Sequence, residues 1–222
     1  MPKKAGIIFV ILGAVLMLSA LLLFLYNGYE DYRAGQDAEM MLDDIQSAIV
    51  MKTETSTNPA KNDIDFDEIT DSEKVTETLP AEMPVVDIDG FGYIGYISIP
   101  GLELELPVMA EWDYNRLEIA PCRHFGSSRT DDLVIAAHNY KSHFRSLSDL
   151  SIGAEVIFVD MDGIENRYFL IKEPETLAPD AVDAVQNSGH DLVLYTCAPG
   201  GVTRVVAFCD RATDETDAVE YE

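Results

Sequence analysis

A cysteine stands at the end of an apolar segment, in a place where a thiol could do chemistry. Cys197 follows Leu192–Tyr195 and Thr196, and precedes the chain-breaking sequence Ala198-Pro199-Gly200-Gly201. A thiol held at a strand end beside a glycine-rich loop can face a groove while the sheet fixes its backbone. Such a thiol could act as the nucleophile in acyl transfer.

Two further residues could complete this chemistry. His138 closes a second apolar segment, Leu133–Ala137, and a histidine can serve as general acid or base. Arg204 lies seven residues after Cys197 in a third apolar segment, Val202–Phe208. If the strands on either side of the short loop pair antiparallel, Arg204 returns beside Cys197, where its guanidinium could donate to a substrate carbonyl or an oxyanion.

The other histidines and cysteines fit structural roles better. We expect His143 in a polar loop, His124 near a turn and His190 at the far end of the Cys197 strand. Cys209 lies in an apolar segment and is expected to be a small buried hydrophobe. Three cysteines cannot all pair within one chain, although a bridge between Cys122 and Cys209 remains open.

The elements that must position these residues are short and mostly β. Expected strands, recognised by apolar runs or by alternation between turn residues, cover 93–99, 102–106, 133–137, 155–159, 167–171, 192–195 and 202–208. The turn 160–163 predicts a hairpin, residues 114–119 a short helix, and Asp180 the N-cap of a helix over 181–186. Seven or eight short strands over about 120 residues predict a β-barrel or sandwich.

A long apolar segment precedes this β-rich part. Residues 5–26 contain no charged side chain. As a helix they would span about 33 Å, enough to cross a bilayer core of about 30 Å. Lys3 and Lys4 precede the segment while Glu30 and Asp31 follow it, which predicts an N-terminus inside the cell and the remainder outside. A cleaved signal peptide would have a shorter apolar region, so we favour a retained anchor.

Residues 27–89 are acidic and poor in apolar residues. We interpret them as a juxtamembrane stalk, with a helix near 30–50 followed by a flexible spacer over 53–63. The expected division is therefore a cytoplasmic end at 1–4, an anchor at 5–26, the stalk at 27–89, a catalytic domain at 90–210 and an acidic tail at 211–222.

The charge excludes one class of partner. The formal net charge is −25, with 40 acidic residues against 15 basic ones, so the surface would repel nucleic acid. The acidic loops lack EF-hand spacing, and charge alone is poor evidence for Ca²⁺. We expect no cofactor and no metal site.

Several passages together resemble the sortase family, over about residues 90–210. The family ends a strand with a Thr-Cys pair, places an arginine on the next strand and carries a histidine after an apolar strand. Here these elements read VLYTC (193–197), Arg204 and AAHNY (136–140). GYISIPGLELELPVM (95–109) resembles the family's opening hairpin, and SLSDLSIGAEVIFVD (146–160) the stretch after its histidine.

The resemblance implies a closed β-barrel transpeptidase with Cys197 as nucleophile, His138 as acid and base, and Arg204 as the residue that holds substrate or oxyanion. Four flanking residues would contact substrate: Tyr195, Thr196, Ala137 and Asn139. The implied partners are exported proteins with a C-terminal Leu-Pro-x-Thr-Gly-like sorting signal. The implied amine acceptor is a peptidoglycan precursor or a pilin lysine.

Two departures bear on the subclass. Val193 stands at the first threonine of the family's Thr-Leu-x-Thr-Cys motif, and Ala137 where a glycine often precedes the histidine. No long helical insertion lies between residue 167 and Cys197, which argues against a typical class B enzyme. Two other functions stay open: a tethered β-domain that only binds a surface partner, and a cysteine peptidase that releases its product to water.

Overall fold

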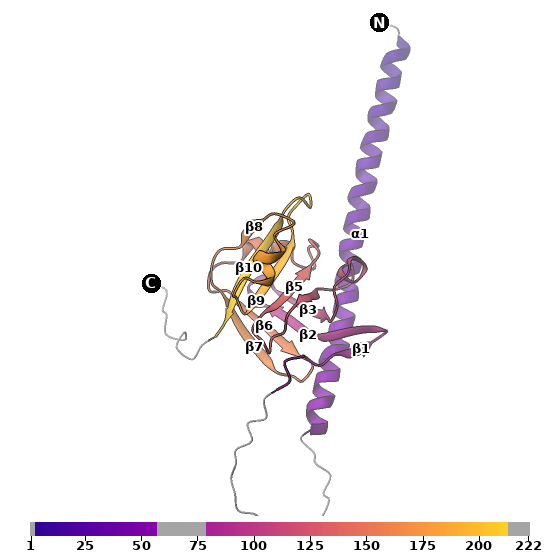
Figure 1. Ribbon diagram of the computed structural model, residues 1–222. Helices are drawn as coiled ribbons and strands as arrows, with labels where there is room; N and C mark the ends of the chain where they lie inside the picture. The colour runs from indigo at the N-terminus through magenta and orange to yellow at the C-terminus, as the bar shows by residue number, and fades with distance from the viewer. Residues whose placement is uncertain (1–2, 57–78, 213–222) are drawn as a thin grey trace, which may run out of the picture.

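The computed structural model describes residues 3–56 and 79–212, and its longest element is helix α1, Lys3–Ser56. No proline interrupts α1, and strong helix formers such as leucine, alanine and methionine recur along it. Figure 1 shows α1 as one rod whose N-terminal half stands clear while its C-terminal half lies against a β-rich domain. The large apolar side chains from Ile7 to Leu25 are exposed, and the helix is long and apolar enough to cross a membrane.

Ten strands and four short helices make up the described residues 79–212. The strands are β1 (Val86–Ile88), β2 (Phe91–Ile99), β3 (Leu104–Met109), β4 (Cys122–Phe125), β5 (Leu133–Ala137), β6 (Glu155–Asp160), β7 (Glu165–Leu170), β8 (Glu175–Leu177), β9 (Leu192–Cys197) and β10 (Arg204–Arg211). The helices are α2 (Tyr114–Leu117), α3 (Val182–Gln186) and the 3₁₀ turns η1 (Pro100–Leu102) and η2 (Arg145–Asp149).

Eight of these strands close into a barrel. They hydrogen-bond in the order β2-β3-β4-β5-β9-β10-β7-β6, and β6 pairs with β2 to complete the ring. The β3–β4 and β5–β9 pairs are parallel, and the other pairs are antiparallel. The two remaining strands add to the ring, β1 beside β2 and β8 beside β10. The prediction of a closed, mainly β barrel of seven or eight strands behind an apolar helix is confirmed.

Closure of the barrel depends on a glycine in β2. The register shifts between Tyr93 and Gly95, and beyond that point β2 pairs with β3 on one edge and β6 on the other. Gly95 has φ +145°, and a Cβ there would lie 1.9 Å from the carbonyl oxygen of Val159. Because no other residue tolerates that approach, Gly95 lets the strand bend between its two partners.

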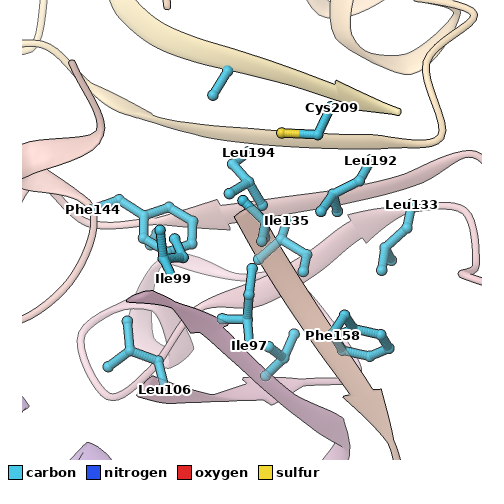
Figure 2. Packing of buried hydrophobic residues seen from close by; sticks show 14 of the residues in the cluster. Ile97, Ile99, Leu106, Leu133, Ile135, Phe144, Phe158, Leu192, Leu194 and Cys209 are labelled. Carbon is cyan, nitrogen blue, oxygen red and sulfur yellow. The ribbon is translucent and has the colours of Figure 1, made fainter. Parts of the chain in front are cut away.

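The core fills the interior of the barrel. Figure 2 shows Ile97, Ile135 and Leu194, from three different strands, directed toward one another. The thiol of Cys209 lies in the same cluster, beside Leu192 and Leu194. All five residues of β5 are buried, as expected for a strand with neighbours on both edges and covered faces.

The C-terminal half of α1 packs on the barrel along one stripe. The buried residues there lie at helical spacing, and they are Ala34, Ala38, Ile45 and Ile49.

Three polar contacts between α1 and the barrel lie along the same stretch of the helix. Asp31 bonds to Ser142, Gln46 Nε2 donates to Glu105 at 3.1 Å, and Lys52 Nζ lies 2.5 Å from Asp162. The helix is therefore held to the barrel over most of residues 31–52.

This packing differs from the expected stalk. The predicted juxtamembrane helix is present, but it continues the anchor and contacts the barrel. The strand β1 also precedes the boundary expected at residue 90. The predicted spacer and acidic tail lie mostly outside the described residues.

Other expectations about the elements have mixed outcomes. The strands of the opening and 160–163 hairpins, the strands before His138 and Cys197, and the short helix at 114 are confirmed. The N-cap of α3 is Ala181 rather than Asp180, and no side chain caps the helix. Three short strands were not predicted, β1, β4 and β8.

Candidate active site

The parallel pairing of β5 and β9 brings two of the candidate residues to one edge of the sheet. Ala137, the last residue of β5, is in register with Thr196 of β9. His138 and Cys197 are therefore the next residues along two neighbouring parallel strands. Because parallel strands end at the same edge, the imidazole and the thiol belong to the same end of the barrel.

The β9–β10 hairpin adds the arginine. Arg204 is directly opposite Cys197 in the antiparallel register, so both side chains lie on one face of the sheet. The connecting loop is closed by a hydrogen bond from Ala198 N to Thr203 O of 2.9 Å, and Gly200 and Gly201 supply the positive φ angles that the turn needs.

One cavity of about 270 Å³ contains all three residues. Its lining is mostly apolar and aromatic, with Cys197, His138 and Arg204 among the few polar groups. The other lining residues are Trp112, Tyr114, Leu117, His124, Ala136, Ala137, Leu177, Ala178, Pro179, Ala181, Val182, Val185, Tyr195 and Val206. An apolar cavity with a few convergent polar groups has the character of a substrate site.

Two of the four predicted substrate contacts line this cavity and two do not. Ala137 and Tyr195 are part of its wall. Thr196 is buried, and its hydroxyl donates to Ala137 O at 2.9 Å, which ties β9 to β5 beside the site. Asn139 borders a separate hollow, and its carbonyl accepts bonds from Arg145 at 3.2 and 3.3 Å.

The imidazole of His138 lies in an environment that disfavours its charge. Burial lowers its pKa below the ordinary value of 6.5, and the Glu118 carboxylate offsets part of that effect. The neutral imidazole is therefore the main form at neutral pH.

The guanidinium of Arg204 is held by backbone rather than by a carboxylate. Its Nη1 donates to the carbonyls of Gly201 and Thr203, each at 3.2 Å. Among the ion pairs formed within residues 3–56 and 79–212, none involves Arg204. The surface ion pair that an acidic chain could have offered this residue is absent from that part of the molecule.

The three thiols differ in accessibility. All are free, so the bridge left open between Cys122 and Cys209 does not form. Burial raises the pKa of each of these two to about 12. Cys197 is only partly buried and lines the cavity, so it is the thiol that a substrate can reach.

The cavity also contains a polar pair that sequence reasoning missed. His124 lies in β4 rather than near a turn, and its Nδ1 is 2.7 Å from the Tyr195 hydroxyl. Burial lowers the pKa of His124 and raises that of Tyr195. The four residues of β4 stand between Pro121 and Gly126, a pair of breakers that could have indicated a short strand.

The other two histidines lie outside the cavity. His143 lies in the loop between β5 and η2, as expected, but its side chain is fully buried, and burial lowers its pKa to about 4. His190 is at the opposite end of β9 from Cys197, as predicted, with its Nδ1 3.0 Å from Asp210.

Comparison with known proteins finds similarity to sortases. The family model described as the sortase domain matches residues 97–212. Sortase A of Bacillus anthracis is 26% identical over 192 residues, which are 80% of this chain and 84% of that protein.

Solved structures are more distant. A sortase C1 of Streptococcus agalactiae is 23% identical with a TM-score of 0.48, covering 58% of this chain and 72% of that one. A sortase E of Streptomyces avermitilis is 21% identical with a TM-score of 0.46, covering 55% and 88%.

Proposed function

Since this chain belongs to the sortase family of cysteine transpeptidases, we propose that it cleaves a sorting signal on exported proteins and transfers them to an amine at the cell surface. The observation that carries this proposal is the single cavity shared by Cys197, His138 and Arg204. A thiol, a titratable imidazole and a guanidinium are the groups that acyl transfer through a thioester needs.

In the first half-reaction, the Cys197 thiolate attacks the carbonyl carbon of the scissile peptide bond. The electrons of the C=O π bond move onto the carbonyl oxygen, which gives a tetrahedral intermediate with an oxyanion. As the oxyanion collapses, the C–N bond breaks and the His138 imidazolium gives its proton to the departing amine. A thioester between Cys197 and the signal's carbonyl remains.

In the second half-reaction, an amine attacks the thioester carbonyl. Neutral His138 takes a proton from the attacking nitrogen, and the C–S bond breaks to release the Cys197 thiolate. The first half-reaction leaves His138 neutral, and the second returns it to the imidazolium form together with the Cys197 thiolate. The cycle therefore needs no additional acid, base or cofactor.

Arg204 would bind the substrate carbonyl or the oxyanion. Nη1 is occupied by the loop carbonyls of Gly201 and Thr203, which fix the plane of the guanidinium. The remaining N–H donors of the fork can then bond to substrate. The apolar walls fit the leucine and proline of a Leu-Pro-x-Thr-Gly-like signal, and the acceptor would be a peptidoglycan precursor or a pilin lysine.

The anchor places this chemistry at the membrane. Residues 5–26 of α1 would span the bilayer, with Lys3 and Lys4 inside and the barrel outside. Tethering keeps the enzyme beside exported proteins as they emerge.

The nucleophile can be tested by trapping the acyl-enzyme. Incubation with a sorting-signal peptide should give a thioester adduct on Cys197, seen by mass spectrometry and released by hydroxylamine. Cys197→Ala should abolish the adduct, a loss of at least about 10³-fold in rate. Cys209→Ala is the matched control and should retain the adduct, because that thiol is buried in the core.

An adduct on Cys122, or an undiminished adduct in Cys197→Ala, would overturn the assignment. A folded protein that forms no adduct with any signal peptide would favour a binding module instead. Product analysis with and without an added amine separates a transpeptidase from a peptidase that releases its product to water.

A further inference from the structure

Two of the segments that border the catalytic cavity also lie beside the membrane-proximal turns of α1. Helix α2 contributes Tyr114 and Leu117 to the cavity wall. Its neighbours Glu118 and Ile119 share a hollow with Glu30, Arg33 and Ala34 of α1. The α2 side of the cavity thus lies beside residues 30–34, one to two turns beyond the apolar segment.

The loop after His138 approaches the anchor even more closely. Asn139 and Tyr140 border a hollow with Tyr26 and Asn27. Tyr26 is the last residue of the apolar segment, and Asn27 is the first residue after it. Ser142 then bonds to Asp31 through its backbone N–H at 3.2 Å and its hydroxyl at 3.3 Å. Asp31 is only five residues beyond Tyr26, about 7.5 Å along a helix.

That distance is comparable with the headgroup layer, about 5–7 Å thick on each side of the bilayer core. The opposite end of the barrel lies much farther along α1 from the apolar segment. The β6–β7 turn is tied to α1 by Asp162 and Lys52, and Lys52 lies 26 residues beyond Tyr26. This corresponds to about 39 Å of helix. The two ends of the barrel therefore differ in height above the membrane.

Two large apolar side chains are exposed at the cavity end of the barrel. Val202, in the loop between Cys197 and Arg204, is 74% exposed, and Tyr114 at the cavity wall is 70% exposed. In Figure 1 the β9–β10 loop points in the same direction as the free N-terminal half of α1. Tyr29 and Tyr32 are also exposed on the adjacent turns of α1, and tyrosine favours the membrane interface.

We propose that the catalytic cavity opens toward the surface of the membrane that anchors α1, with the β9–β10 loop and α2 in contact with lipid headgroups. The occupant of this face is the bilayer itself, because α1 is one continuous helix from the apolar segment to its contacts with the barrel. Both substrates would then enter along the plane of the membrane. The inference rests on the proposed anchoring role of α1.

The orientation can be measured by quenching from the headgroup layer. The full chain with Cys197→Ser receives one new cysteine, Val202→Cys, Glu165→Cys or Tyr29→Cys, which is labelled with a fluorophore. The protein is reconstituted into phosphatidylcholine vesicles that contain a headgroup nitroxide lipid. The parent without an added cysteine measures background labelling of the two buried thiols.

The label at Val202 should be quenched about threefold more strongly than the label at Glu165, since the nitroxides occupy a thin headgroup layer. A label at Tyr29→Cys should be quenched as well and shows that the anchor is inserted. Equal quenching at Val202 and Glu165, or stronger quenching at Glu165, would overturn the proposed orientation. No quenching at Tyr29 would overturn the anchor and the inference with it.

This measurement does not use catalysis. Loss of acyl-enzyme formation would overturn the proposed reaction and leave the orientation intact. An unquenched label at Val202 would overturn the orientation and leave the proposed reaction intact.

Discussion

At the scale of residues, the proposed chemistry depends on a histidine that burial keeps mostly neutral. Burial lowers the pKa of His138 below 6.5, and Glu118 counteracts only part of this. If attack needs a thiolate together with an imidazolium, only a small fraction of molecules is in the reactive form at neutral pH. The pH dependence of the reaction should reveal this.

The first prediction concerns that dependence. The thiolate fraction of any cysteine grows with pH, while the imidazolium fraction of His138 shrinks as pH rises through its pKa. Their product gives a bell-shaped profile of kcat/KM, and the lowered pKa of His138 places the midpoint of the acid limb below pH 6.5. Rates measured from pH 5 to 10 with a signal peptide test this. A flat profile, or an acid limb above pH 6.5, would contradict it.

The second prediction concerns Arg204. Its guanidinium bonds to two loop carbonyls and still has donors to offer, which a single ammonium cannot reproduce. We expect Arg204→Lys to lower kcat/KM by about 10²-fold, the usual cost of losing an oxyanion donor. Arg145→Lys is a matched control, because Arg145 also donates to a backbone carbonyl but does not line the cavity. Similar effects in both variants would argue against a special role for Arg204.

The three candidate residues stand out in the sequence because each one ends, follows or begins an apolar strand, and the structure brings them to one cavity. The contribution of their neighbours could not be predicted. Thr196 and Asn139 adjoin Cys197 and His138 in sequence, yet one side chain bonds inward to Ala137 and the other residue follows the loop away from the cavity. Which way a neighbour points depends on strand parity and loop path, and these are set by tertiary packing.

At the scale of elements, the site depends on a parallel pair far apart in sequence. The apolar runs of β5 and β9 were visible as strands, but 54 residues separate the end of β5 from the start of β9. Their adjacency follows from barrel closure rather than from any local pattern. The four-residue β4 escaped prediction for a related reason, because so short a run has no periodicity to detect.

Gly95 provides the third prediction. A Cβ at this position would meet the Val159 carbonyl at 1.9 Å, so the β2–β6 pair could not close. We expect Gly95→Ala to lower the free energy of unfolding by about 3 kcal/mol, as steric strain in a packed barrel does. Urea denaturation followed by circular dichroism measures the change.

Gly90→Ala serves as control for this substitution. Gly90 also has positive φ, +83°, but a Cβ there would meet nothing within 4 Å. Its cost should be about 1 kcal/mol, from backbone conformation alone. Equal destabilisation in the two variants would mean that the close approach at Gly95 is unimportant.

At the scale of the whole molecule, the anchor and the catalytic domain form one packed unit over the described residues. The stripe of Ala34, Ala38, Ile45 and Ile49 was only partly visible in the sequence, because alanine is inconspicuous among so many acidic residues. Its partner surface comes from β2 and β3, more than 40 residues later.

The last prediction tests this packing. Ala38→Asp would bury a carboxylate against the barrel, which costs several kcal/mol and should detach the helix. Amides of residues 34–49 should then exchange with deuterium at least about tenfold faster in vesicle-reconstituted protein. Met40→Asp is the control, because Met40 is exposed on the same helix and should leave exchange unchanged. Unchanged exchange in Ala38→Asp would mean that the helix is held elsewhere.

The burial of two thiols has a consequence for oxidative damage. An oxidised cysteine is usually rescued when a nearby thiol condenses with its sulfenic acid to form a disulfide. Cys122 and Cys209 are locked in two separate core clusters, so Cys197 has no resolving cysteine in its own chain. In the proposed location outside the membrane, where oxidants are met, such an enzyme would regain its thiolate only through a reductant supplied by another molecule.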